Sequence, residues 1–216
     1  MSKLAIVLTA IVFIVSVPAS GTLVPDIGGD PIYTQTDDDF SGQQTDWALT
    51  VYSYVFDTTS SSLPGSLALD PGEMLFMYLL FCHDPARTVS MDYFSVGNPE
   101  LVPINPVGYE PSTSIVPVGF ESTPFQAPYT YGYSGPSQAT IYSYSGDFLN
   151  PLCTLDPGEY SLVYYIADAP GYTQVPASAS GGGVGDNGLV PGPIPEPTTI
   201  FLLGFGALAL LRRRRA

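Results

Sequence analysis

The 216-residue sequence predicts an all-β protein built around a single antiparallel β-sandwich. Glycine and proline contribute 22 residues each and divide the chain into short segments. The segments between them are rich in Val, Thr, Tyr and Phe, which favour strands, and tyrosine alone occurs 15 times. Several such segments follow one another at short spacing without the 3.6-residue period of an amphipathic helix, which is typical of a sandwich.

Strands are expected over residues 47–56, 74–82, 88–96, 115–120, 129–133, 140–144 and 160–166. The run 74–82 is apolar throughout, so a buried helix is an alternative there. An internal repeat favours the strand: Leu-Asp-Pro-Gly-Glu occurs at residues 69–73 and again at 155–159, where a segment rich in β-branched and aromatic residues follows.

The Pro-Gly pair of this repeat predicts a type II turn in which glycine takes a positive φ. Each copy is preceded by a similar strand, at 50–54 and at 140–144. We therefore expect two strand–loop–turn–strand hairpins, one in each half of the domain.

The region between the two chain ends is strongly acidic. From residue 20 to residue 190 the sequence holds 19 acidic residues against one basic residue, Arg87, a formal charge of −18. Such a body repels phosphate backbones, which excludes nucleic acid as a partner. Asp37, Asp38 and Asp39 form an acidic run that could ligate Ca²⁺, but neighbouring side chains diverge, so a solvated turn is expected and no metal or cofactor is predicted.

The N-terminus has the pattern of a secretory signal peptide. Lys3 gives a positive start, Leu4 to Val17 is an apolar core, and Ala19 ends a small-residue cleavage site. We expect signal peptidase to remove residues 1–19, with cleavage near Gly21 as the alternative. The mature chain is then an exported protein.

The C-terminus combines three parts in a fixed order. Pro195-Glu196-Pro197 comes first, an apolar run follows at 200–211, and Arg212, Arg213, Arg214 and Arg215 precede the last residue. The apolar run partitions into lipid as a transmembrane helix, whereas the arginines stay on the cytoplasmic side. Twelve residues span only about 18 Å of a hydrocarbon core of about 30 Å, so the anchor is weak; a permanent membrane anchor is the alternative.

These parts resemble the PEP-CTERM sorting signal of Gram-negative bacteria. The resemblance covers about the last 22 residues, 195–216, and implies processing by an exosortase, a membrane-embedded peptidase linked to exopolysaccharide and biofilm production. It implies a protein that is anchored in the membrane before processing and is then found at the cell surface or outside the cell. It does not say what the delivered domain does.

The remaining divisions follow from composition. Residues 20–46 form an acidic N-terminal segment, residues 47–168 the β-sandwich, and residues 169–194 a Gly/Ser/Pro-rich linker. Within that linker, 177–192 is expected to be a flexible tether, because it is rich in Ala, Ser and Gly.

Two cysteines, Cys82 and Cys153, lie in the exported part, where an even number suggests a disulfide; two free thiols are the alternative. His83 is the only histidine and follows Cys82 directly, and adjacent strand residues point to opposite faces, so the two do not form a nucleophile–base pair. We expect no enzymatic activity, with a secreted hydrolase that uses paired carboxylates as an alternative.

A row of tyrosines offers a sharper hypothesis for the delivered domain. Tyr129, Tyr131, Tyr133, Tyr142 and Tyr144 alternate along two expected strands and could form a flat strip on which sugar rings stack. The alternative is that these rings cover a sheet face and pair across strands. The sequence thus predicts a non-enzymatic surface or matrix protein, with a carbohydrate-binding module as the second possibility.

Overall fold

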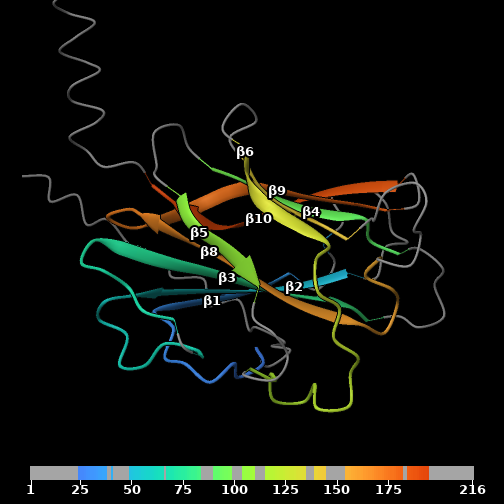
Figure 1. Ribbon diagram of the computed structural model, residues 1–216, viewed down its shortest axis with the longest axis horizontal. Coiled ribbons are helices and arrows are strands. Elements are labelled where there is room, and N and C mark those ends of the chain that lie inside the picture. Colours follow the sequence, from blue (N-terminus) through green and yellow to red (C-terminus); the bar gives the residue numbers. More distant parts are fainter. Residues whose placement is uncertain are drawn as a thin grey trace, which may run out of the picture.

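The computed structural model describes residues 24–37, 40, 49–65, 67–83, 90–98, 104–109, 115–134, 139–144, 154–181 and 184–194. Within these residues the protein is all-β, with two five-stranded sheets (Figure 1). Sheet I contains, in spatial order, β1 (Tyr33–Asp37), β2 (Leu49–Asp57), β3 (Glu73–Cys82), β8 (Tyr160–Asp168) and β5 (Ile104–Tyr109). Sheet II contains β10 (Val184–Pro193), β9 (Tyr172–Gly181), β4 (Tyr93–Gly97), β7 (Ala139–Ser143) and β6 (Thr130–Ser134).

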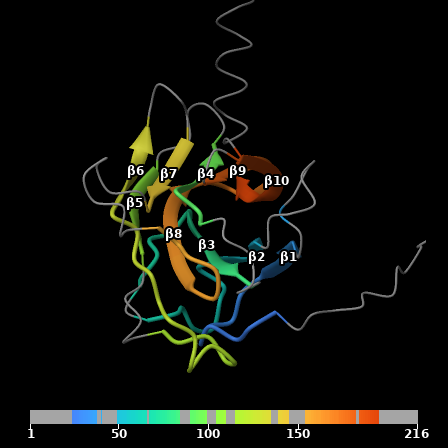
Figure 2. The same cartoon turned by 90° about the vertical axis from the view of Figure 1, so that its right-hand side faces the viewer.

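The two sheets face each other in the sandwich arrangement that the sequence predicts. Neighbouring strands within each sheet are antiparallel. Seen from the side, the sheets form two stacked layers (Figure 2). Aromatic rings fill the space between them: Tyr78 of β3 meets Phe94 of β4 with ring centroids 5.6 Å apart, and Phe76 stacks on Tyr165 at 5.1 Å. These side chains are fully buried and join the two sheets into one core.

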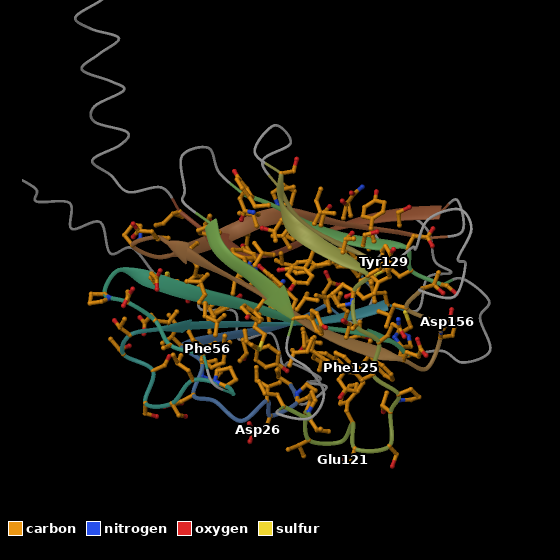
Figure 3. All side chains as sticks on the ribbon, viewed as in Figure 1. Asp26, Phe56, Glu121, Phe125, Tyr129 and Asp156 are labelled. Carbon is orange, nitrogen blue, oxygen red and sulfur yellow. The ribbon has the colours of Figure 1, made fainter. Side chains whose placement is uncertain are left out.

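The outer face of sheet I is buried as well. Tyr54, Phe56 and Leu79 lie on this face and are covered by a loop layer, formed by residues 24–32, 58–65 and 115–128. Figure 3 shows Asp26 and Glu121 in this layer, on the side of sheet I that faces away from sheet II. Because both faces of β2, β3 and β8 are covered, these strands are apolar almost throughout and lack the alternation of a half-exposed strand.

The repeated pentapeptide forms the predicted turn in both copies. In the first, Glu73 N donates to Asp70 O at 3.0 Å and Gly72 has a φ of 97°. The Glu73 carboxylate accepts a further bond from Asp70 N at 2.8 Å. Residues 156–159 repeat the two bonds at 3.0 and 3.1 Å, with a glycine φ of 86°. The turn geometry read from the sequence is confirmed.

Only one of the two expected hairpins exists. β2 and β3 pair as predicted, but β7 belongs to sheet II, whereas β8 lies in sheet I between β3 and β5. β3 and β8 pair with each other, with Glu73 opposite Asp168 and Phe81 opposite Tyr160, so the two turns lie at opposite ends of the sandwich. The reason is burial: β8 is apolar on both faces and requires a central place in the doubly covered sheet, whereas β7 buries alternate residues only.

Several element boundaries differ from the sequence predictions. Residues 115–120 contain a turn and no strand; Ile115 and Phe120 are buried in the loop layer, where they cover sheet I. β4 begins at Tyr93, and Met91 before it makes an isolated bridge to Leu155. β1 lies inside the predicted acidic N-terminal segment, residues 20–46. β5 lies in the stretch from Pro103 to Pro128, which carries a proline every few residues, and it is an edge strand, the place in a sheet that tolerates proline.

The predicted linker at 169–194 is wrong, because β9 and β10 occupy it and belong to sheet II. The alternation of side chains explains this. Val175, Ala177 and Ala179 are buried against the core, and the residues between them face the other way. Small side chains suit this position because Ala179 lies opposite the large ring of Phe94 in the β4–β9 ladder, and both belong to the core that also holds the rings of β3. The sandwich therefore extends to Pro193, and within the range 177–192, expected to be a flexible tether, the described residues 177–181 and 184–192 lie in strands.

Candidate functional sites

The last described residues tie the C-terminal end of β10 to the sandwich. Pro193 lies opposite Tyr172 in the β9–β10 ladder. Ile194 N donates a hydrogen bond to Gly171 O at 3.1 Å. Pro195, the first residue of the predicted sorting tripeptide, follows Ile194 directly in the sequence. The described part of the sandwich thus reaches the residue directly before Pro195.

Two side chains of sheet I hold this part of β10. The buried Tyr78 hydroxyl donates to Pro191 O at 2.7 Å, and burial raises the Tyr78 pKa well above its ordinary value, so the hydroxyl stays a neutral donor. Gln35 Nε2 donates to Leu189 O at 2.8 Å. Between them, Val190 is fully buried. β10 is therefore fixed to sheet I by side-chain contacts, in addition to its ladder with β9.

A second candidate site lies at the other edge of the sandwich, where β5 and β6 end the two sheets. Tyr129, Tyr131 and Tyr133 are 57%, 47% and 36% exposed there. Tyr131 meets Tyr109 of β5 with ring centroids 5.6 Å apart, and Tyr109 stacks on Phe125 at 6.4 Å. Figure 3 shows Tyr129 and Phe125 on this side of the molecule. We call Tyr129, Tyr131 and Tyr133 the tyrosine edge.

Two of the five predicted stacking tyrosines do not belong to this edge. Tyr142 and Tyr144 are fully buried, which corrects their assignment to an exposed strip. The Tyr142 hydroxyl donates to Tyr164 O at 2.6 Å and the Tyr144 hydroxyl to Ser161 Oγ at 2.8 Å. Both rings point between the sheets, since β7 lies inside sheet II and its apolar face must be covered.

The sequence analysis did not identify Tyr109 and Phe125 as part of the candidate site. Both lie in the proline-rich stretch, which shows no regular period, and β5 itself changes register between Ile104 and Val107. Their aromatic character was the only available signal. The structure places them beside the tyrosine edge: Tyr109 contacts Tyr131, and Phe125 contacts Tyr109.

The side chains of Cys82 and His83 contact different residues. The buried Cys82 Sγ contacts Leu155 O at 3.6 Å, and burial, with Glu159 and Asp156 nearby, raises its pKa to about 12. His83 Nδ1 instead lies 2.9 Å from Thr50 Oγ1. Cys82 is a free thiol in the part of the chain described; Cys153 lies outside it, and the disulfide stays a prediction.

The acidic character of the body is visible in the structure. All six Lys and Arg residues lie outside the described residues, so the described surface carries carboxylates and no guanidinium or ammonium group. Among these residues no three His, Cys, Asp or Glu side chains come together as a metal site. Asp37 ends β1 opposite Val51; its neighbours Asp38 and Asp39 lie outside the described part.

The predicted signal peptide at 1–19 and the sorting segment at 195–216 also lie outside the described residues. This covers Pro195, Glu196, Pro197 and the arginines 212–215. In the part that is described, no helix has the length and apolar character needed to cross a membrane.

Three comparisons with known proteins gave the following matches. The C-terminal domain of the Streptococcus pyogenes antigen I/II-family protein AspA aligns with a TM-score of 0.32 and 7% identity, over 70% of this chain and 56% of that chain. No curated protein matches the sequence significantly. The PEP-CTERM protein-sorting motif matches residues 193–215. The chain therefore carries a PEP-CTERM sorting signal and is an exported protein targeted to an exosortase, a membrane enzyme.

Proposed function

We propose that the protein is a non-enzymatic component of the cell surface or extracellular matrix, which an exosortase delivers and which associates with exopolysaccharide. One observation carries this proposal: the sorting motif begins at residue 193, on the last residue of β10. The sorting motif therefore follows the β-sandwich directly, and the sandwich is the domain that the exosortase would deliver. The acidic body suits a soluble role outside the cell, because its charge opposes adsorption to anionic surfaces.

A carbohydrate-binding role is the second candidate, and the tyrosine edge favours it. Exposed rings on a strand present flat apolar faces to solvent, and sugar rings stack on such faces through their C–H groups. The support of Tyr131 by Tyr109 lowers the conformational entropy that a ligand would otherwise have to remove.

The charge of the body narrows the ligand class. The described residues include Asp and Glu side chains but no Lys or Arg, so this surface is negatively charged and would repel an anionic polysaccharide. We therefore propose a neutral polysaccharide as the ligand at the tyrosine edge.

The test is binding of the mature protein to the exopolysaccharide of its own host and to a glycan array. Tyr131→Ala and Tyr133→Ala together should weaken binding by about tenfold or more. Tyr172→Ala is the matched control: Tyr172 is 37% exposed and contacts the ring of Tyr33 at 4.9 Å, but it lies on β9, three strands away from β6 in sheet II. Unchanged affinity of the double variant contradicts sugar binding at this edge and leaves a purely structural matrix role.

A further inference from the structure

β10 is both the last strand of the sandwich and the approach to the sorting motif. Residue 193 belongs to both, and Ile194 is still hydrogen-bonded to Gly171. A peptidase binds the chain beside the scissile bond in an extended form whose main-chain groups pair with the enzyme. In the folded protein, the groups just before Pro195 are already engaged by the sandwich.

Only a short segment separates the sandwich from the predicted membrane segment. Five residues, 195–199, separate Ile194 from the apolar run that begins at Ile200, and their full reach is about 20 Å. A five-stranded sheet is itself about 20 Å wide, because neighbouring strands lie about 4.8 Å apart. The folded body is thus held within one body width of the membrane in which the sorting enzyme lies.

The position of β10 at the edge of sheet II allows its C-terminal end to separate from the sheet. β10 is an edge strand, paired only with β9 in its sheet. Ile194 N donates to Gly171 O, so the alternate residues 190, 192 and 194 direct their main-chain groups toward β9. Pro191 and Pro193 therefore lie at positions that face the open side of the edge strand, where a missing N–H costs no ladder bond. The main-chain oxygens of Leu189 and Pro191 accept from the Gln35 and Tyr78 side chains instead.

We propose that the exosortase acts on a form of the protein in which the C-terminal end of β10, residues 189–194, has left sheet II. Local opening of an edge strand needs only a part of the global unfolding free energy. The Tyr78 hydroxyl is the contact that opposes this opening most directly, since it is buried and bonds the main chain of Pro191. This inference rests on the proposed delivery by an exosortase and adds a conformational step to it.

Pulse-chase measurement of C-terminal processing in the native host tests the step. Tyr78→Phe removes the bond to Pro191, together with the 3.2 Å contact between the Tyr78 and Tyr165 hydroxyls, which both lie in sheet I. Loss of the Pro191 bond should raise the rate of processing about fivefold, the increase in open population that the loss of one hydrogen bond produces. Tyr144→Phe is the matched control, because it removes an equally buried tyrosine hydroxyl bond, to Ser161, that does not touch β10. It should leave the rate unchanged.

A spacer gives an independent measurement. Inserting Gly-Ser-Gly-Ser between Ile194 and Pro195 supplies a free extended segment, so processing should become fast and no longer respond to Tyr78→Phe. Equal rates for the wild type, Tyr78→Phe and the spacer variant overturn the opening step but leave delivery by an exosortase intact. Absence of processing in every variant, the spacer variant included, contradicts the proposed function and the opening step together.

Discussion

Tyr131 lies directly opposite Tyr142 in the β6–β7 ladder, yet Tyr131 is 47% exposed and Tyr142 is fully buried. Residues opposite each other in an antiparallel pair share a face of the sheet, so the face that forms the core at β7 reaches solvent one strand further on. Tyr131 closes this edge by its edge-on contact with Tyr109 of the other sheet. Two adjacent tyrosines therefore have different roles.

This difference predicts different stability effects. Tyr142→Ala leaves a cavity between the sheets and should lower the free energy of unfolding by about 3–5 kcal/mol. Tyr131→Ala should cost less than about 1 kcal/mol, since much of its ring is in water already. Urea denaturation followed by near-ultraviolet circular dichroism measures both. Equal losses would show that the tyrosine edge is part of the core.

The repeated turns depend on their glycines. Gly72 and Gly158 have φ values of 97° and 86°, a region that strains any residue with a Cβ. Gly72→Ala and Gly158→Ala should each lower the free energy of unfolding by about 1–2 kcal/mol. Gly132→Ala serves as the control, because its Cβ would meet nothing within 4 Å. A Gly72→Ala protein as stable as Gly132→Ala would refute the turn geometry.

The Cys82 thiol should be unreactive in the folded, reduced protein. Its pKa of about 12, against an ordinary value of 9.0, lowers the thiolate fraction at pH 8 by about a thousandfold, and its side chain is buried. Iodoacetamide should therefore label Cys82 only after unfolding, which peptide mass spectrometry detects. Rapid labelling of Cys82 without denaturant would contradict its placement between the sheets.

Glu159 should make stability depend on pH. Burial raises the pKa of its carboxyl, with a smaller rise from Asp156 and an opposing bond from Asp156 N. The folded state then binds the proton more tightly than the unfolded state, so this stabilisation is complete below the ordinary carboxyl pKa and is lost as the pH rises through the raised value. In the Glu159→Gln variant, the free energy of unfolding should no longer decrease over this pH range because of residue 159. Urea denaturation at several pH values measures this.

The pKa of the Glu121 carboxyl is shifted in the opposite direction, to a lower value. The hydrogen bond that its carboxylate accepts from Gly119 N at 3.1 Å lowers its pKa, so its contribution is lost as the pH falls. Glu121→Gln should therefore flatten the acid side of the profile. If both variants changed the pH profile in the same direction, the assigned environments would be wrong.

The parts of the fold that the sequence predicted are those with strong local signals. β2, β3 and β8 are long runs of β-branched and aromatic residues, and the turns at 70–73 and 156–159 carry Pro and Gly at defined positions. The pairing of β3 with β8 has no local signature, because residues about 85 positions apart meet only after the chain has folded. The expected second hairpin failed for this reason.

β9 and β10 were missed for a different reason. Their composition of Gly, Ala, Ser and Pro has low strand propensity, which led to the linker assignment. The two-residue alternation from Val175 through Ala177 to Ala179 was present but consists of small side chains, whose burial depends on the large rings across the core. Of the predicted stacking residues, Tyr129, Tyr131 and Tyr133 are exposed, and sugar binding by them stays a prediction; the burial of Tyr142 and Tyr144 required knowing which strand lies inside sheet II.

Intact-mass spectrometry of the protein recovered from the surface and medium of its native host tests the central claim most directly. If an exosortase delivers the sandwich, the mature species should begin near residue 20 and should lack the arginines 212–215, with its new C-terminus close to Pro195-Glu196-Pro197. A surface or secreted species that still ends in Arg215-Ala216 would contradict delivery by cleavage at the sorting motif.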